Sequence, residues 1–359
     1  MKTNMMIVLL LLFSLSLSVS CTTEGIDGFE VFRMSEKDNV LHIPAEQMIE
    51  EVSAVTLEDS SEAPVLGQIS GLYESGESYL IVSERTVYEY GKDGKFLRKI
   101  GTNGRGPGEY LNPSGTGMSG GIIYVFDYNT QNILKYAEDG CFISSSSHPE
   151  LMNSGIYLKS FFLSGDDMIF YSSTNSSRQD MFRYDAGNDV LSLFSAKDRE
   201  MLPGEVILGE NFIFGKRSEP YVYNNFNDTV YVLGNDRLVP SFLMETGKYR
   251  YKYSDLTVDK ILSVSGSRLH FWWIAAAGES ILLSYSVTVG DESPSFLGLY
   301  NTRTGEYSQN VEITGMQEDF TAITPDERLF EGMKDDELLS VRPVSDTGDG
   351  YAIIKYRFK

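Results

Sequence analysis

The sequence predicts an all-β fold, a single β-propeller of about six blades with about four antiparallel strands in each blade. Two observations predict it. Short apolar or alternating runs separated by turn residues recur along the chain, and strand–turn–strand units recur with a period of about 40–50 residues. No segment longer than about ten residues keeps the apolar period of a helix.

The apolar runs have the length and composition of short strands. They are rich in β-branched and aromatic residues, and turn residues separate them. The clearest runs are residues 79–82, 122–126, 168–171, 229–232, 281–283 and 352–356.

A tyrosine at the end of a strand marks each repeat, and in the first two repeats an Asp-Gly hairpin turn follows it. Tyr90, Tyr136 and Tyr184 lie 46 and 48 residues apart, Tyr231 follows 47 residues later, and Tyr300 follows after 69 more. The longer last interval predicts an insertion, to which we assign residues 274–278.

The ends of the repeat array are predicted to meet. A single blade cannot bury both of its faces, so the blades are expected to close into a ring that removes exposed sheet edges. The final run, residues 351–358, is therefore expected to pair with an N-terminal strand within one blade.

Four motifs carry a family resemblance. They are Gly-Pro-Gly-Glu-Tyr at 106–110, Val-Phe-Asp to Asn-Ile-Leu-Lys-Tyr at 125–136, Asn-Asp-Thr-Val-Tyr at 227–231 and Ile-Lys-Tyr-Arg-Phe-Lys at 354–359. These motifs resemble those of six-bladed β-propeller lipoproteins related to NHL-repeat propellers, and the first motif is the most specific. The resemblance covers most of the mature chain, and it implies a fold and an envelope location without an established activity.

Residues 1–20 have the layout of a secretory signal. Lys2 precedes an apolar run at 5–13, which is shorter than the about 20 residues that span a bilayer, and small residues lead to Cys21. The arrangement resembles the lipobox of bacterial lipoproteins, which implies cleavage before Cys21 and acylation of that residue. The alternative is an ordinary secreted protein with a chance cysteine. Because Thr22 rather than aspartate follows, we expect an outer-membrane lipoprotein, facing the periplasm or the surface.

Three segments follow from these patterns. Residues 1–20 are the expected signal peptide, residues 21–38 are the lipidated N-terminus and a polar tether, and residues 39–359 are the propeller. With Cys21 acylated, Cys141 has no partner for an internal disulfide.

The charge balance excludes one class of partner. The chain has 30 basic and 51 acidic residues, a net charge of −21, and no basic stretch that would suit a phosphate backbone. Nucleic-acid binding is therefore not expected.

The segment at 101–110 is the first candidate ligand site. Its glycines and proline turn the backbone sharply, and Arg105, Glu109 and Tyr110 could then face a sugar or a carboxylate. The alternative is a connector between blades, in which Glu109 accepts backbone hydrogen bonds and Tyr110 packs between the blades.

Both tryptophans lie in the second candidate site, His270-Phe271-Trp272-Trp273. Aromatic faces stack on sugar rings and anchor partner proteins, which makes Trp272 and Trp273 candidate ligand-binding residues. The alternative is a buried strand, since alternation would bury at least one of the two.

No catalytic residue is predicted. Gly-Met-Ser-Gly-Gly at 117–121 matches the pattern of serine hydrolases, but it lies in a turn rather than at a strand-to-helix elbow. His42, His148 and His270 are isolated in sequence and are weak metal candidates. The sequence predicts no cofactor and leaves a divalent metal open.

These patterns favour a membrane-anchored, non-enzymatic binding or scaffold propeller whose ligand is a glycan, a peptide or a protein. The alternative is a metal-dependent propeller enzyme of the lactonase or lyase type, with its chemistry at the central channel. The enzyme alternative requires a metal held by convergent side chains, whereas the binding module requires exposed aromatic or charged side chains.

Overall fold

The computed structural model describes residues 26–31, 40–164, 167–172, 181–195, 211–234, 237–252, 257, 268–287, 293–315, 323–344 and 350–359. Within these residues the chain is almost entirely β-structure, with one short helix, α1 (Pro149–Asn153), and two single 3-10 turns, Ala45–Gln47 and Gly247–Tyr249. The predicted signal peptide and Cys21 lie outside the described residues.

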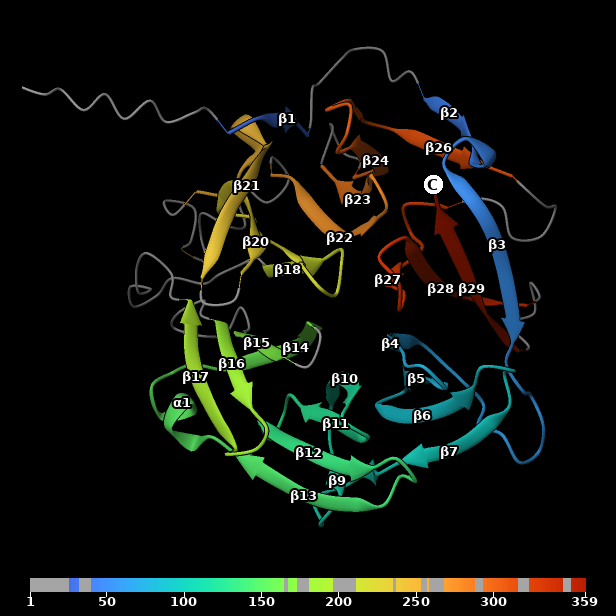
Figure 1. Cartoon of the computed structure of the whole chain (residues 1–359), viewed down its shortest axis with the longest axis vertical. Helices are drawn as coiled ribbons and strands as arrows, with labels where there is room; N and C mark the ends of the chain where they lie inside the picture. Colours follow the sequence, from blue (N-terminus) through green and yellow to red (C-terminus); the bar gives the residue numbers. More distant parts are fainter. Residues whose placement is uncertain are drawn as a thin grey trace, which may run out of the picture.

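Six antiparallel sheets are arranged as blades around a common axis, which confirms the predicted propeller (Figure 1). From the axis outward, blade 1 consists of β4 (Ile69–Glu74), β5 (Ser78–Ser83), β6 (Thr86–Gly91) and β7 (Phe96–Ile100). Blade 2 consists of β10 (Pro113–Ser119), β11 (Ile122–Asp127), β12 (Asn132–Ala137) and β13 (Phe142–Ser147). Blade 3 consists of β14 (Leu158–Ser164), β15 (Asp167–Ser172), β16 (Met181–Asp185) and β17 (Val190–Ser195).

The second half of the ring repeats this order. Blade 4 consists of β18 (Asn211–Phe214), β19 (Tyr221–Asn224), β20 (Asn227–Leu233) and β21 (Leu238–Glu245). Blade 5 consists of β22 (His270–Ala277), β23 (Ser280–Ser286), β24 (Ser295–Asn301) and β25 (Tyr307–Ser308). Blade 6 consists of β27 (Phe330–Glu331), β28 (Glu337–Pro343), β29 (Tyr351–Phe358) and β3 (Ile49–Thr56).

The ring closes in blade 6, as the sequence predicts. The C-terminal strand β29 pairs on one side with β28 and on the other with the N-terminal strand β3. Ile354 lies opposite Ser340 in β28 and opposite Ala54 in β3. Hydrogen bonds between the two ends of the chain therefore hold the ring together.

The landmark tyrosines occupy one structural position. Tyr90, Tyr136, Tyr184, Tyr231 and Tyr300 all lie in the third strand of their blades, β6, β12, β16, β20 and β24. The insertion in the last interval is not at residues 274–278, because these residues form the innermost strand of blade 5 and its turn. The extra length lies instead between β21 and β22.

Two N-terminal strands lie outside the regular repeat. β1 (Gly28–Glu30) pairs in parallel with β21 as a fifth strand of blade 4, and β2 (Leu41–Pro44) pairs in parallel with β26 (Val311–Thr314). The ring of Phe29 stacks on Tyr300 with 3.9 Å between the ring centroids. Part of segment 21–38 thus belongs to the propeller. A strand of three residues is too short to show alternation in the sequence.

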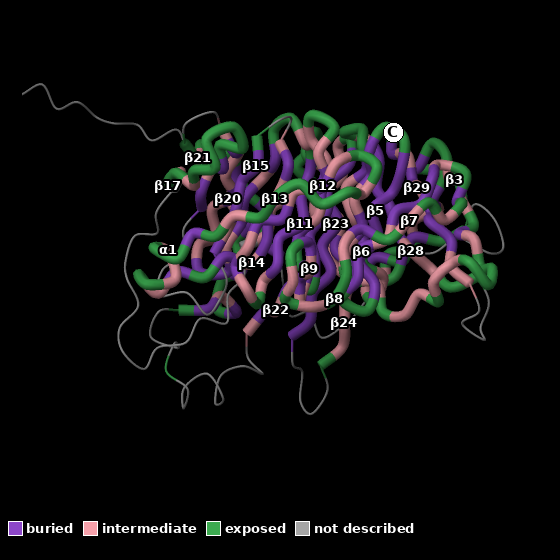
Figure 2. The backbone as a smooth tube through the Cα atoms, turned by 90° about the horizontal axis from the view of Figure 1, so that it is seen from below, coloured by how far each residue is buried: buried purple, intermediate pink, exposed green. Residues whose placement is uncertain are grey.

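The core lies between the blades, where apolar side chains from facing sheets interdigitate. Figure 2 shows the buried strands running through the thickness of the ring and the exposed turns at its two ends. Phe126 of blade 2 and Phe170 of blade 3 meet edge to face at 5.2 Å. Each blade is therefore buried on both faces, which leaves the connecting segments and the outer strands as the surfaces available for function.

Candidate functional site

The connector between blades 1 and 2 folds into a small closed loop. β8 (Thr102–Asn103) pairs in parallel with β9 (Glu109–Tyr110), so the two ends of the loop are clipped together. The Gly104 N–H donates to the Tyr110 carbonyl at 3.0 Å, and the Glu109 N–H donates to the Gly106 carbonyl at 3.0 Å. The loop tip, residues 104–108, is therefore held by backbone hydrogen bonds at its base.

The Glu109 carboxylate fixes the inside of this loop. Its Oε2 atom accepts the Gly106 N–H at 2.6 Å. A Cβ atom at position 104 would lie 2.0 Å from the same oxygen, so a larger residue there would displace the Glu109 carboxylate. Glu109 is thus a positioning residue for the loop tip.

Tyr110 anchors the loop to blade 1. Its side chain is fully buried, its hydroxyl donates to the Ile100 carbonyl at 2.5 Å, and the Val87 N–H donates to that hydroxyl at 3.0 Å. Burial raises the pKa of Tyr110, so the hydroxyl stays protonated at neutral pH. From blade 2, the Tyr136 hydroxyl donates to the Gly108 carbonyl at 3.0 Å. These contacts match the connector interpretation for Glu109 and Tyr110.

Arg105 lies at the tip of this braced loop, exposed to solvent, between two surface hollows. Within the described residues its guanidinium makes no ion pair, although the chain is strongly acidic. A hollow of about 550 Å³ is lined by residues 104–109 and by Thr130, Asn132, Leu134, Phe142, Ser144 and Ser145. A hollow of about 460 Å³ is lined by Arg105, Leu111, Tyr128, Asn129, Thr130 and Tyr157.

The turn between β11 and β12 lies between the two hollows, and its Thr130 side chain lines both of them. Asp127 is fully buried, and its carboxylate accepts the backbone N–H groups of Leu111, Asn112 and Asn129 and the Thr130 hydroxyl. A rigid turn thus presents Asn129 and Thr130 beside Arg105. Sequence reasoning missed this turn, although an aspartate at a strand end with a threonine three residues later is a turn signal.

The two tryptophans have different environments. Trp272 is 57% exposed and lies at a bulge of the innermost strand β22, with its ring 4.5 Å from the His270 ring. Trp273 is buried in the core between blades 5 and 6. The bulge turns Trp272 away from the blade faces, so it is available for contacts that Trp273 cannot make.

The three histidines lie apart in the fold. His42 on β2 pairs with Glu312 at 2.9 Å, His148 precedes α1, and His270 begins β22. Within the described residues no group of three or more histidine, cysteine or acidic side chains could hold a metal ion. The Gly-x-Ser-x-Gly motif spans the hairpin between β10 and β11, and no helix follows it.

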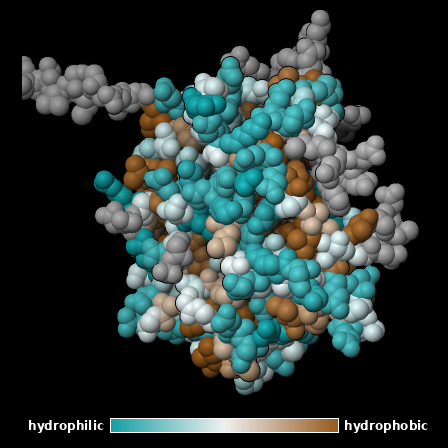
Figure 3. Space-filling view, turned by 45° about the vertical axis from the view of Figure 1, so that its right-hand side comes forward, coloured by the Kyte–Doolittle hydropathy of each residue, from teal (hydrophilic) through white to brown (hydrophobic). Residues whose placement is uncertain are grey.

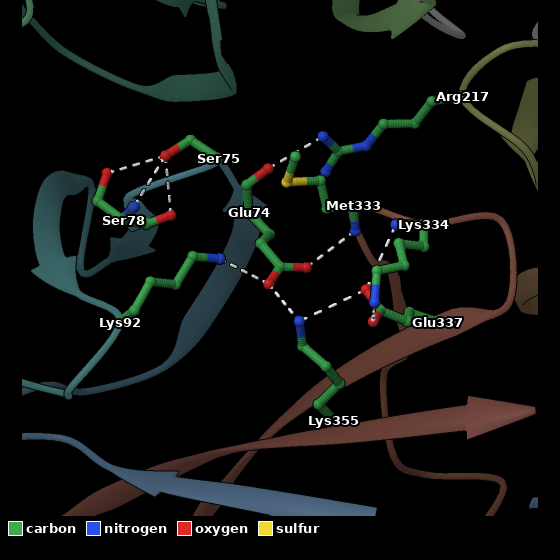
Figure 4. Close-up of polar contacts among 9 residues, drawn as sticks. All are labelled: Glu74, Ser75, Ser78, Lys92, Arg217, Met333, Lys334, Glu337 and Lys355. Carbon is green, nitrogen blue, oxygen red and sulfur yellow. Dashed lines mark hydrogen bonds and ion pairs between the residues drawn. The ribbon is translucent and has the colours of Figure 1, made fainter. Parts of the chain in front are cut away.

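A second polar cluster links blade 1 to blade 6 (Figure 4). The buried Glu74 carboxylate accepts hydrogen bonds from Lys92 at 2.6 Å, from Lys355, and from the Met333 N–H at 2.8 Å. Glu337 pairs with Lys355 at 3.4 Å. Burial alone would raise the pKa of Glu74, but the hydrogen bonds from Lys355 and Lys92 outweigh it and lower that pKa.

The turn after β18 reaches the same cluster from blade 4. Arg217 donates to the Glu74 carbonyl at 3.0 Å, and its guanidinium lies 4.5 Å from the centre of the Tyr73 ring. The Gly215 N–H donates to the Glu331 carboxylate of blade 6 at 3.2 Å. Glu74 of blade 1 thus accepts hydrogen bonds from blade 6, and Glu331 of blade 6 accepts one from blade 4. The cluster therefore links blades 1, 4 and 6 at one end of the axis.

Glu331 gives this end of the ring a pH dependence. Burial raises the pKa of Glu331 to about 7, despite the Gly215 N–H and the nearby Arg217. Because the folded pKa is raised, the folded chain binds more protons than the unfolded chain between about pH 4.5 and 7, and stability falls as pH rises through this window.

At pH 8 the Glu331 carboxylate must be ionised, which costs stability that a neutral glutamine does not cost. Glu331→Gln should therefore raise the unfolding free energy by about 1–2 kcal/mol at pH 8 and by much less at pH 5. Urea unfolding at the two pH values measures the difference. Glu62→Gln, at a solvent-exposed position, is the control and should change the unfolding free energy equally at both pH values. Equal stabilities of the Glu331 variant and the wild type at pH 8 would contradict the assignment.

A family model described as "Domain of unknown function (DUF4934)" matches residues 29–350. A solved structure of a Bacteroides fragilis protein described as exported is 14% identical, with a TM-score of 0.62 over 93% of this chain and 99% of that one. A member of the DUF4221 family from Bacteroides vulgatus is 10% identical, with a TM-score of 0.53 over 87% and 97%. The curated proteins contain no match. Among the described residues, no helix has the length and apolar character needed to cross a membrane.

Proposed function

The chain belongs to the DUF4934 family of unknown function, and we propose that it is a non-enzymatic binding module of the bacterial envelope, anchored through Cys21, that captures a glycan, peptide or protein at the Arg105 loop. The observation that carries the proposal is the presentation of Arg105, a cation without an ion pair among the described residues, on a rigid loop between two hollows with mixed polar and apolar linings. A preorganised arginine binds carboxylates or other anions with little loss of conformational entropy.

The composition of the hollows supports a ligand with both polar and apolar groups. Tyr128 and Tyr157 offer aromatic surface, and Asn129 and Thr130 offer hydrogen-bonding groups. Figure 3 shows one face of the molecule, on which apolar residues are scattered among hydrophilic ones. Such a surface favours recognition by a few well-placed groups over burial of a wide apolar patch.

Replacement of Arg105 tests the proposal. The wild-type chain from residue 22 onward and its Arg105→Ala variant are compared on an array of acidic and neutral glycans and on a pool of random decapeptides. We expect the wild type to retain ligands that bind the variant at least tenfold more weakly, which corresponds to about 1.4 kcal/mol.

Arg303→Ala is the matched control, because Arg303 is an exposed arginine on the turn between β24 and β25 of blade 5. This variant should bind like the wild type. Equal binding by the Arg105 variant and the wild type, or no captured ligand on either collection, would refute a binding site at this loop.

A further inference from the structure

The outer edge of blade 2 is an open strand edge. β13 (Phe142–Ser147) pairs with β12 on one side, and within the described residues no strand pairs with its other side. Its sequence, Phe-Ile-Ser-Ser-Ser-Ser, contains no charged residue and no proline, and five of its six residues are exposed. Edge strands ordinarily carry charges or proline that prevent pairing with another chain, and β13 has neither.

Two other outer edges of this propeller are protected. The outer strand of blade 3, β17, is uncharged and open within the described residues as β13 is, but only β13 lies beside a hollow that Arg105 also lines. The chain itself covers β21 with β1, which pairs in parallel and inserts Phe29 into the core. The outer strand of blade 1, β7, carries Arg98 and Lys99. The covered edge of blade 4 shows that a short extended segment with one apolar side chain can add to a blade of this ring.

The larger hollow runs beside β13. Phe142, Ser144 and Ser145 line it, and of these Phe142 and Ser145 lie opposite Tyr136 and Leu134, which share one face of β12. Thr130 and Asn132 line the other end of the hollow, near Ser147, where Arg105 also lies. A strand added to β13 would therefore place every second side chain over the hollow and bring one end close to Arg105.

We propose that β13 binds an extended peptide segment of a partner protein by strand addition, and that Arg105 pairs with an acidic side chain or a terminal carboxylate of that segment. This inference rests on the proposed function and names its ligand class. Backbone groups of β13 supply the hydrogen bonds, the hollow receives alternate side chains, and Arg105 sets the register. The net charge of −21 opposes an acidic partner at long range, but salt at about 0.15 M screens charges beyond about 8 Å and leaves the local contact.

Cys141 provides a direct readout. It is exposed, immediately precedes β13, and is the only thiol of a chain that starts at residue 22. Labelled with an environment-sensitive fluorophore, it should report peptides from a random decapeptide pool with free C-termini. We expect bound peptides to be enriched in β-branched and acidic residues, and to bind Arg105→Ala at least tenfold more weakly.

The strand geometry is tested separately from the charge. Hydrogen-bonded and non-hydrogen-bonded pairs alternate along an antiparallel ladder. Counted from the bonded pair Ala137 and Cys141, with the bulge in β13 included, Ser145 falls in a non-bonded pair, so its N–H lies on the open side of β13. Ser145→Pro should then lower the affinity for the selected peptides at least tenfold, and it should leave the pairing of β13 with β12 intact. Leu193→Pro is the matched control, because Leu193 is exposed on the outer strand of blade 3 and the same alternation from the bulge places its N–H on the open side of β17; it should have no effect on peptide binding.

A second measurement covers the case in which Ser145→Pro does not fold. The selected peptide is synthesised with N-methyl groups on alternate residues, and only one of the two methylation patterns should abolish binding to the wild type. Unchanged binding of both N-methylated peptides to the wild type would overturn strand addition. If acidic glycans bind at Arg105 and no peptide is selected, the proposed function stands and strand addition is overturned. If neither glycans nor peptides bind, both the proposed function and strand addition are overturned.

Discussion

Ile354→Ala is expected to destabilise the propeller by about 3 kcal/mol, within the range of about 2–5 kcal/mol for buried large-to-small changes. Ile354 is fully buried in the centre of β29, between β28 and the N-terminal strand β3. Its removal leaves a cavity in the one blade that is built from both ends of the chain. The effect should therefore weaken the closure of the ring as well as the local core.

Urea unfolding followed by circular dichroism measures this change. Val344→Ala is the control, because Val344 follows β28 in the same blade and is about half exposed, so it should change stability by less than about 0.5 kcal/mol. Similar losses for the two variants would show that blade 6 does not depend on the pairing of β29.

Glu74→Ala is expected to cost about 3 kcal/mol, because it leaves Lys92 and Lys355 without their shared carboxylate. Both lysines are partly exposed, so water compensates some of the loss. Glu312→Ala removes an exposed pair with His42 and should cost less than about 1 kcal/mol. A Glu74 variant as stable as the Glu312 variant would contradict a fastening role for the cluster.

The same cluster has a defined pH dependence. The lowered pKa of Glu74 means that its contribution is present above the unfolded value of 4.5 and is lost as pH falls through the folded value. The difference in unfolding free energy between wild type and Glu74→Gln should therefore narrow as the pH falls below 4.5.

The repeat and the blade number could be predicted because they depend on local signals, and the ring closure could be predicted because a single blade cannot bury both of its faces. Tyr90, Tyr136 and Tyr184 recur at nearly constant spacing since each ends the third strand of a blade. β1 could not be predicted, because its three residues are ordered by their contact with β21 and Tyr300, far away in the chain. The insertion was misplaced for a related reason, since the buried inner strand of blade 5 shows no polar alternation.

The candidate site was predicted only in part. Arg105 and Glu109 lie in a segment with a distinctive glycine-rich sequence, so the sequence pointed to the loop. Tyr157 and Phe142 reach the hollows from other segments, and only the fold brings them there. The Glu74 cluster was missed entirely, because its partner Lys355 is 281 residues away.

Hydrogen exchange with and without a bound peptide shows where on the propeller the peptide binds. The wild-type chain from residue 22 onward is saturated with its tightest selected decapeptide, and amide exchange is followed along the whole chain by mass spectrometry. We expect slower exchange in residues 142–147 and in the loop at 104–109, with little change on blades 4 to 6. Protection confined to other blades, with unchanged exchange in β13 and the Arg105 loop, would contradict peptide binding at β13.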